Sequence, residues 1–506
     1  MARLAWGILV LSATVGCAVG PGYRRPELGV PAEWRRINPT VDSLRPFYDS
    51  LIANRDTLPL NPGRTQAVSV DSSAGDRIFL ADTTPNLVWF DLLRDPALRT
   101  LVETALRENR DVRVAIATID EFRAQYGVAR GDFFPQISLN AQGGRTQTVL
   151  GTLGSFTYNQ LQATANLAWE LDFWGRIRRS TEAARNDLLA QRENQRAVVL
   201  TLVSDVATTY LQLRQLDLAL EISRRTLAAN RETFRLARRR FDQGLISELD
   251  VRQFESEVAS PAASVAQLEG QIRQTENQLS VLVGRNPGGI PRGRPLTEVL
   301  GDLKVPASLP SDLLERRPDV RQAEAQFHAA TARIGVAKGD LLPKLMVTGD
   351  YGTYASNADD LFKNNSEIYQ ILGGVSMPLF TGGRVGKQVD VARARAEQSR
   401  YGYEQTVLTA LREVEDAITG VRASRNQVAA QQTQVDALRR ALRLAEMRYQ
   451  SGASSYLDLL DAQRSLFGAE LSLAQVEGQQ ATAAVTLYRA LGGGWPVTPT
   501  DSVPPR

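Results

Sequence analysis

The sequence predicts a mixed fold of long α-helices and short β-hairpins, in which one structural unit is used twice. Three observations support this prediction. Short motifs recur at one fixed offset, apolar and polar residues alternate after two of the prolines, and two stretches of about 65 residues contain no proline. The first observation defines the repeat, the second defines the strands, and the third defines the longest helices.

The repeat is visible in motifs from both halves of the chain. Asp111-Val112-Arg113 recurs as Asp319-Val320-Arg321, an offset of 319 − 111 = 208 residues. The same offset relates three further pairs: Gly244 and Gly452, Asp250 and Asp458, and Gly284 and Gly492. Because this register holds without a gap, we expect one repeat over 85–284 and a second over 311–492. The Pro- and Gly-rich residues 285–310 are expected to link them.

The period of the pattern changes within each repeat. Residues 96–132 and 312–340 are rich in Ala, Glu and Arg and are followed by a proline, which predicts helices. The alternating residues that follow predict β-hairpins over 136–171 and 344–378, with about ten residues in each strand. The alternation divides the strand at 161–171 into two faces, one with Leu161, Leu167 and Trp169 and the other with Gln162, Thr164 and Asn166.

The longest helices are expected over 178–242 and 385–450, and each would extend about 95 Å at 1.5 Å per residue. Val199, Val203, Val206 and Tyr210 follow a heptad spacing, and a second apolar register runs beside it. Two apolar seams on one helix indicate neighbours on two sides, as in a closed ring of helices. Each long helix should end at a glycine turn, followed by a helix over 247–283 or 455–490.

The composition argues against an enzyme. The chain has 506 residues, one Cys, one His and a formal net charge of +3. A single Cys excludes an internal disulfide framework and a Cys-based zinc site, and a single His argues against a His-cluster metal site and triad chemistry. The nearly balanced charge gives no strong field for nucleic acid. We therefore expect no catalytic residue, metal, cofactor or nucleic-acid partner.

The N-terminus has the features of an export signal. Arg3 precedes an apolar stretch that is too short to span a membrane, so we expect a signal peptide over 1–16. Cys17 stands where a bacterial lipoprotein signal is cut and acylated, which makes it the candidate lipidation site. Residues 17–84 would then be a lipidated N-terminal segment with a polar insertion from residue 38, and residues 493–506 a C-terminal tail.

Strands of this length in an exported chain suit the outer membrane, where a tilted strand of about ten residues crosses the bilayer. A sheet in lipid must close, because its edges cannot be hydrogen-bonded there. Four strands cannot close alone, and eight strands from two chains would leave a lumen filled by side chains. Twelve strands from three chains are the smallest assembly expected to leave a passage.

Four strings carry a resemblance to a known family: PGYRRP after Cys17, LPSDLLERRPDV over 309–320, PLFTGGR over 378–384 and YLDLLDAQR over 456–464. From about residue 85 to 492, the chain resembles the TolC-type outer-membrane efflux factors, in the lipoprotein branch that serves RND-type pumps. The resemblance implies a homotrimer with a 12-stranded β-barrel continued by a long periplasmic α-helical barrel. Such a trimer is a passive exit duct in the outer membrane, joined by a periplasmic adaptor to an inner-membrane RND-type transporter.

The resemblance also implies roles for residues near the helix ends. Asp458 and Asp461 lie three residues apart, hence on one helix face, and would form a ring of six carboxylates that closes the periplasmic gate and selects cations. The same residues are also expected to stabilise the start of their helix. The implied gate tethers are Tyr449, Arg464 and Asp250, and the implied tip turns for adaptor docking are Gly244 and Gly452.

Two alternatives differ from a pump duct. One is the outer-membrane component of a type I protein secretion system, which the candidate lipidated Cys and the short C-terminus disfavour. The other, from a different class, is a periplasmic coiled-coil adaptor. The hairpins over 136–171 and 344–378 argue against an adaptor, because a coiled coil has no reason to alternate apolar and polar residues.

Overall fold

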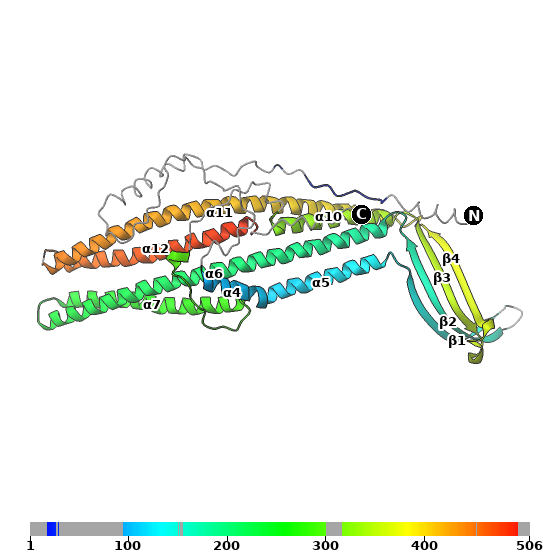
Figure 1. Cartoon of the computed structure of the whole chain (residues 1–506), viewed down its shortest axis with the longest axis horizontal. Coiled ribbons are helices and arrows are strands. Elements are labelled where there is room, and N and C mark those ends of the chain that lie inside the picture. The colour runs from blue at the N-terminus through cyan, green and yellow to red at the C-terminus, as the bar shows by residue number, and fades with distance from the viewer. Residues whose placement is uncertain are drawn as a thin grey trace. The chain divides into compact units, whose positions relative to one another are not determined.

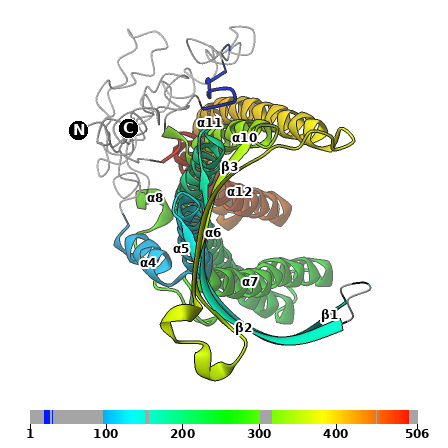
Figure 2. The same ribbon diagram turned by 90° about the vertical axis from the view of Figure 1, so that its right-hand side faces the viewer.

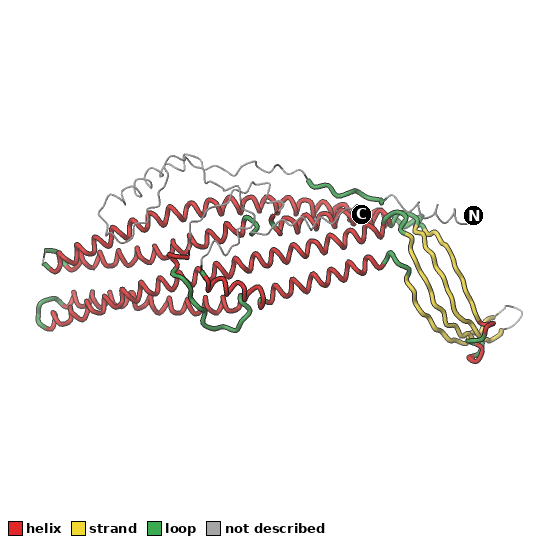
Figure 3. Tube along the Cα trace, in the orientation of Figure 1, coloured by secondary structure: helices red, strands yellow, loops and turns green. Residues whose placement is uncertain are grey.

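A computed structural model of the chain describes residues 18–26, 29, 95–149, 151, 155–299, 316–451 and 453–493 (Figure 1). Cys17, Gly452 and the expected insertion and tail lie outside the described residues. Within them, the chain consists of helices and a single β-sheet (Figure 3). No helix in these ranges is both long and apolar enough to cross a membrane.

The chain forms two compact units. The unit with the sheet comprises Met1–Leu28, Ala115–Asn194 and Arg321–Thr406. The helical unit comprises Gly29–Val114, Gln195–Val320 and Val407–Arg506. These units differ from the two repeats expected over 85–284 and 311–492, because each repeat contributes residues to both units.

The sheet is antiparallel, with its four strands in the order β1-β2-β3-β4 (Figure 1), and its strands are curved (Figure 2). Its strands are β1 (Gln136–Val149), β2 (Ser155–Leu171), β3 (Lys344–Ala355) and β4 (Glu367–Ser376). The first hairpin spans 136–171 as predicted, but its strands, of 14 and 17 residues, are longer than the about ten residues expected. β4 ends at Ser376 rather than at 378, where Pro378 has no N–H to donate. Because β2 pairs with β3, the two hairpins join, and β1 and β4 are left as the edges.

The sheet has the polar and the apolar face that the alternation predicts. On the polar face, the Gln142 side chain donates a hydrogen bond to Gln162 over 2.8 Å. On the other face, Leu167 lies directly opposite Ile137 of β1 and Gly349 of β3. This face leaves large apolar side chains exposed, among them Ile137, Leu139, Tyr369, Ile371 and Val375. An exposed apolar surface of this kind fits a lipid or protein environment better than water.

The two longest helices are α6 (Arg176–Asp242) and α11 (Arg384–Gln450), of 67 residues each. α6 begins two residues earlier than expected, because the Asp172 carboxylate accepts hydrogen bonds from the N–H groups of Ile177 and Arg178. The starts of the two helices are 384 − 176 = 208 residues apart. The helices that follow, α7 (Glu248–Leu282) and α12 (Tyr456–Ala490), have 35 residues each and the same offset.

The helix expected over 96–132 is in fact two helices, α4 (Pro96–Glu108) and α5 (Arg110–Gly131). Asn109 separates them. Its side-chain oxygen accepts a hydrogen bond from the Asp111 N–H over 2.8 Å, which caps α5, and its amide donates to the Leu282 carbonyl over 2.9 Å. The counterpart α10 (Pro318–Gly339) has proline at its first position, and residues 312–315 of the helix expected there lie outside the described residues.

The heptad seam of α6 lies in the core of the helical unit. Val203, Val206 and Tyr210 are at most 7% exposed and pack in one cluster with residues of α4, α7 and α12. Leu296 and Val299, in the short helix α8 (Leu296–Val299), are buried in the same cluster. The described part of the expected linker over 285–310 is therefore part of the core rather than a free connection.

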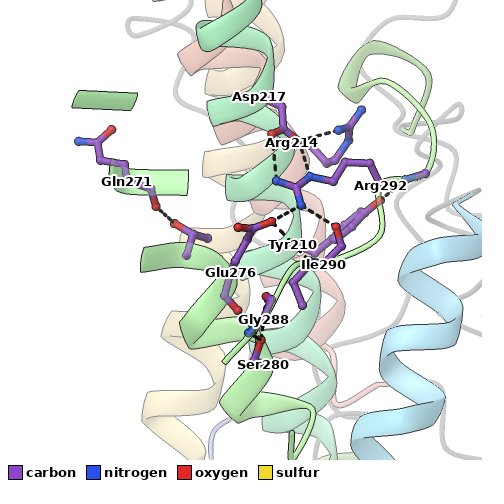
Figure 4. A network of polar contacts seen from close by, with 11 residues as sticks. Tyr210, Arg214, Asp217, Gln271, Glu276, Ser280, Gly288, Ile290 and Arg292 are labelled. Atoms are coloured by element: carbon purple, nitrogen blue, oxygen red, sulfur yellow. Dashed lines mark hydrogen bonds and ion pairs between the residues drawn. The ribbon is translucent and has the colours of Figure 1, made fainter. Parts of the chain in front are cut away.

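Polar contacts fix the same segment in place (Figure 4). Arg292 forms an ion pair with Asp217, at 3.1 Å between Nε and Oδ2, and a second with Glu276. The Gly293 N–H donates to the Tyr210 hydroxyl over 2.9 Å, and that hydroxyl donates to Asp95 over 2.9 Å. Segment 285–299 thus joins α6 and α7 to the start of α4.

Candidate functional site at the helix tips

Each long helix ends in a tight turn (Figure 3). At the end of α6, Gly244 has φ 73°, and the Leu245 N–H donates to the Arg240 carbonyl over 2.9 Å. This left-handed glycine ends the helix and lets α7 return beside it. At the end of α11, the Ala453 N–H donates in the same way to the Arg448 carbonyl over 2.8 Å. The Gly452 of that turn lies outside the described residues.

Asp250 and Asp458 occupy the same place in the two turns. Each is the third residue of its helix and forms a capping box with the serine before the helix. Asp250 accepts hydrogen bonds from the N–H and hydroxyl of Ser247 over 3.0 and 2.8 Å. Asp458 accepts the equivalent bonds from Ser455, both over 3.2 Å. These bonds of Asp250 stay within its own helix cap.

Asp458 and Asp461 are both exposed on α12, one turn apart. Their carboxylates are therefore accessible to solvent and to ions. Within the described residues, no group of His, Cys, Asp or Glu is arranged to hold a metal ion. The geometry suits a surface that acts through its charge.

Tyr449 connects the ends of the two long helices. Its hydroxyl accepts a hydrogen bond from Arg240 Nη1 over 3.1 Å, and the guanidinium carbon lies 5.9 Å from the centre of the Tyr449 ring. Tyr449 belongs to α11 and Arg240 to α6. The contact therefore joins the two helical hairpins within one chain.

Arg464 connects the two returning helices. Its Nε donates to Glu257 Oε1 of α7 over 2.7 Å. The side chain of Glu257 is 10% exposed and that of Arg464 is 56% exposed, so the carboxylate is the buried end of the pair. Hydrogen bonding to Glu257 raises the pKa of Arg464 above its ordinary value and keeps it charged.

An aromatic pair lies beside this ion pair. The rings of Phe254 and Tyr456 have their centres 3.7 Å apart, and both residues are buried. The Tyr456 hydroxyl is buried and has no hydrogen-bond partner among the described residues. Burial raises the pKa of Tyr456 above its ordinary value, so the phenol stays neutral. The pair gives the tip an apolar contact beside its two polar ones.

The structure thus places Tyr449 and Arg464 in contacts between hairpins, and it places Asp250 and Asp458 in helix caps. Their partners, Arg240 and Glu257, were not among the residues predicted from the sequence. Glu257 follows Asp250 by two helical turns and lies on the side of α7 that carries the buried Phe254. A carboxylate on the buried side of a helix needs a cationic partner, so the position of Glu257 in the helix pattern was the one signal that could have predicted an ion pair.

Comparison with known proteins identifies the class. The family model described as "outer membrane efflux protein" matches residues 101–285 and again 309–493. The chain therefore belongs to the outer membrane efflux protein family, and it is an efflux channel of the outer membrane rather than an enzyme. This confirms the predicted family, localisation and exit-duct function.

The similarity extends over nearly the whole chain. The solvent efflux pump outer membrane protein SrpC of Pseudomonas putida is 34% identical over 488 residues, which are 96% of each chain. The cation efflux system protein CusC of Escherichia coli is 31% identical over 96% of this chain and 98% of its own. Among solved structures, the outer-membrane channel OprN superposes with a TM-score of 0.80 at 29% identity, covering 95% of this chain and all of that one.

Proposed function

We propose that three copies of the chain close a 12-stranded barrel in the outer membrane, continued by a barrel of α-helices. The observation that carries this proposal is the sheet, which has one apolar face and two open edges, β1 and β4. Lipid tolerates no open edge, so the β4 edge of one chain pairs with the β1 edge of the next. We also infer a duplication of one unit, which the element bounds at an offset of 208 residues support.

In this proposal the trimer is the passive exit of a tripartite pump, with a periplasmic adaptor and an inner-membrane RND-type transporter as partners. SrpC is named for solvent efflux and CusC for cation efflux. The polar face of the sheet, which carries Gln, Thr and Asn, would line the passage with side chains that impose no single substrate shape. We therefore propose small molecules of varied chemistry as the cargo.

We propose that the helix tips form the gate. Asp458 and Asp461 of three chains would surround the axis with six carboxylates that attract cations. Because these charges repel one another, other contacts must hold the closed tip together, and we assign this role to Tyr449 with Arg240 and to Arg464 with Glu257. Asp250 caps the start of α7 within its own chain, and its tether to a neighbouring tip, which the family resemblance implies, stays a prediction.

We further propose that Cys17 is acylated and that the turns at Gly244 and Gly452 receive the adaptor. If so, Cys17→Ser abolishes acyl labelling of the mature chain, and continued labelling excludes Cys17. Substitution of Gly244 by a β-branched residue strains a left-handed position. It is expected to reduce cross-linking to the adaptor while the trimer persists.

The proposed function is tested by deletion and complementation. Cells that lack the chain should accumulate a dye that the pump exports, while the level of the transporter stays unchanged. The full chain should restore export and sediment with the outer membrane as a trimer. Restored export by a form that is monomeric in the membrane would contradict the trimeric duct.

A further inference from the structure

Asp350 is the one charged residue in the middle of the polar face of the described sheet. It lies half-way along β3 and shares this face with Gln162 and Asn166 of β2. The other charged residues of the face, Glu170 and Lys344, lie at one end of the sheet. Glu170 pairs with Arg176 over 2.8 Å and Lys344 with Asp340 over 3.1 Å. Their charges are therefore compensated.

A chain of two side-chain amide hydrogen bonds, here called the relay, leads from Asn140 of β1 through Asn166 of β2 to the Asp350 carboxylate. Asn166 lies directly opposite Asp350 in the β2–β3 register, and its Nδ2 donates a hydrogen bond to Oδ1 of the carboxylate. Asn140 of β1 in turn donates to Asn166 Oδ1 over 2.8 Å. Because a carboxylate only accepts hydrogen bonds, it fixes the orientation of both amides. The relay stabilises the negative charge across three strands.

The relay does not neutralise this charge. Amides orient dipoles toward Asp350, but within the described residues the carboxylate forms no ion pair with Lys, Arg or His. Its other cross-strand neighbour is Gln370 of β4, which is also uncharged. A carboxylate that is hydrogen-bonded to amides but has no cationic partner keeps its negative charge and can attract mobile cations.

We propose that Asp350 makes the lumen of the barrel prefer cations, independently of the carboxylates at the helix tips. This inference rests on the proposed trimer, in which the polar face lines the passage. Cationic substrates and metal cations would then pass the barrel lumen more readily than anions. No part of the tip contributes to this effect.

The size of the effect follows from the barrel geometry. Twelve strands about 4.8 Å apart and tilted by about 40° give a backbone radius of about 12 Å, which places three carboxylates about 9 Å from the axis. With water between the charges, monovalent cations at the axis are enriched about fivefold in 10 mM salt and about twofold in 0.15 M salt. The selectivity should therefore weaken as salt is added.

The test is a reversal-potential measurement on single trimers in a planar bilayer, across a KCl gradient whose dilute side is 10 mM. The background carries Asp458→Asn, Asp461→Asn and Arg464→Ser, so that the proposed acidic ring is neutral and the tip is loosened. In that background, Asp350→Asn should lower the cation-over-anion permeability ratio at least twofold, whereas Asp350→Glu should keep it. Asp359→Asn, which removes the same charge from an exposed loop, is the matched control and should change the ratio little.

A second variant allows the charge to be changed on channels that have already folded, so that differences in folding between variants cannot explain the result. Asp350→Cys should show the low ratio, an anionic methanethiosulfonate should restore it on the same channels, and a cationic one should invert it. The unsubstituted chain, treated identically, controls for Cys17. A permeability ratio that is unchanged in Asp350→Asn and insensitive to both reagents would overturn the inference. Absence of any trimeric conductance, even in the unsubstituted chain, would instead overturn the proposed function.

Discussion

At the scale of single residues, the Arg464–Glu257 pair is asymmetric. Its carboxylate is 10% exposed and its guanidinium 56% exposed. Loss of Arg464 leaves a buried charge without a partner, which is costly, whereas loss of Glu257 leaves an arginine that water can solvate. The exposed guanidinium also limits what the intact pair contributes to stability.

This asymmetry gives a prediction for the tip. Arg464→Ser should destabilise the tip by about 2 kcal/mol and Glu257→Gln by about 1 kcal/mol or less, both measured by thermal unfolding of the trimer. Both variants should raise single-channel conductance, because the returning helices lose a contact. The double variant should be less destabilised than the sum of the singles. Strict additivity would show that the two residues are not coupled.

The acidic pair on α12 gives a second prediction. Asp458→Asn together with Asp461→Asn should weaken cation selectivity and reduce block by multivalent cations in a planar bilayer, because the proposed ring loses its charge. Asp250→Asn is the matched control, since it alters the equivalent helix cap without touching the ring. If the double variant keeps full block, Asp458 and Asp461 act only in helix capping.

At the scale of elements, residues 18–26 form a strap across helices of the sheet unit. Tyr23 stacks on His328, with ring centres 4.5 Å apart, and its hydroxyl donates to Glu324 of α10 over 2.9 Å. Arg25 Nε also donates to Glu324, over 2.7 Å. His328, the single histidine of the chain, packs against this strap as a structural residue, and its Nε2 lies 3.0 Å from Glu182 Oε1.

The strap makes a testable contribution to stability. Tyr23→Ala should destabilise the attachment of the strap by about 2 kcal/mol, because the stacked ring and its hydrogen bond are both lost. Tyr23→Phe should destabilise it by about 1 kcal/mol, because the ring remains and only the hydrogen bond is lost. The measurement is the rate of trypsin cleavage after Arg24 in the folded protein. Equal rates in the two variants would show that the ring contributes nothing beyond its hydroxyl.

The faces of β2 give a prediction about the membrane. Leu167→Arg on the apolar face should cost about 2–4 kcal/mol near the bilayer centre, whereas Gln162→Arg on the polar face should cost little. Asn166 is a poorer control than Gln162, because it holds Asp350. The readout is the yield of outer-membrane trimer. Equal losses from both variants would contradict the assignment of the two faces, and a greater loss from Gln162→Arg would place the faces one residue out of register.

The sequence predicted most elements because their signals are local. Period, prolines and the 208-residue register located α6, α7, α11 and α12 to within two residues. The break at Asn109 was missed, because its side chain caps α5 and also bonds a carbonyl far away in the sequence. The burial of segment 285–299 was missed for the same reason, since it depends on a core assembled from distant helices.

In the candidate site, too, the local contacts could be predicted from the sequence and the long-range contacts could not. The caps of Asp250 and Asp458 follow from Ser-x-x-Asp in the sequence. The partners of Tyr449 and Arg464 do not, because Arg240 and Glu257 lie in the other half of the chain. Periodicity shows which helix face is buried, but it does not show which neighbour covers that face.

At the scale of the whole molecule, the central claim is that three chains, and no other number, close one barrel through β1 and β4. The β2–β3 pairing shows that the two hairpins of one chain already join in this manner. A fourth strand pairing, between β4 of one chain and β1 of the next, would complete the ring. Such a head-to-tail interface closes only at a fixed copy number and otherwise extends without limit.

The most direct test is oxidative cross-linking between the edges in outer membranes. Ala141→Cys in β1 is combined in turn with Ile371→Cys, Gly373→Cys and Val375→Cys in β4, and Ala141→Cys alone is the control. The account predicts that at least one pair gives covalent dimers and trimers with nothing larger, while the control gives neither. Products that extend beyond three chains, or uncross-linked chains for every pair, would contradict it.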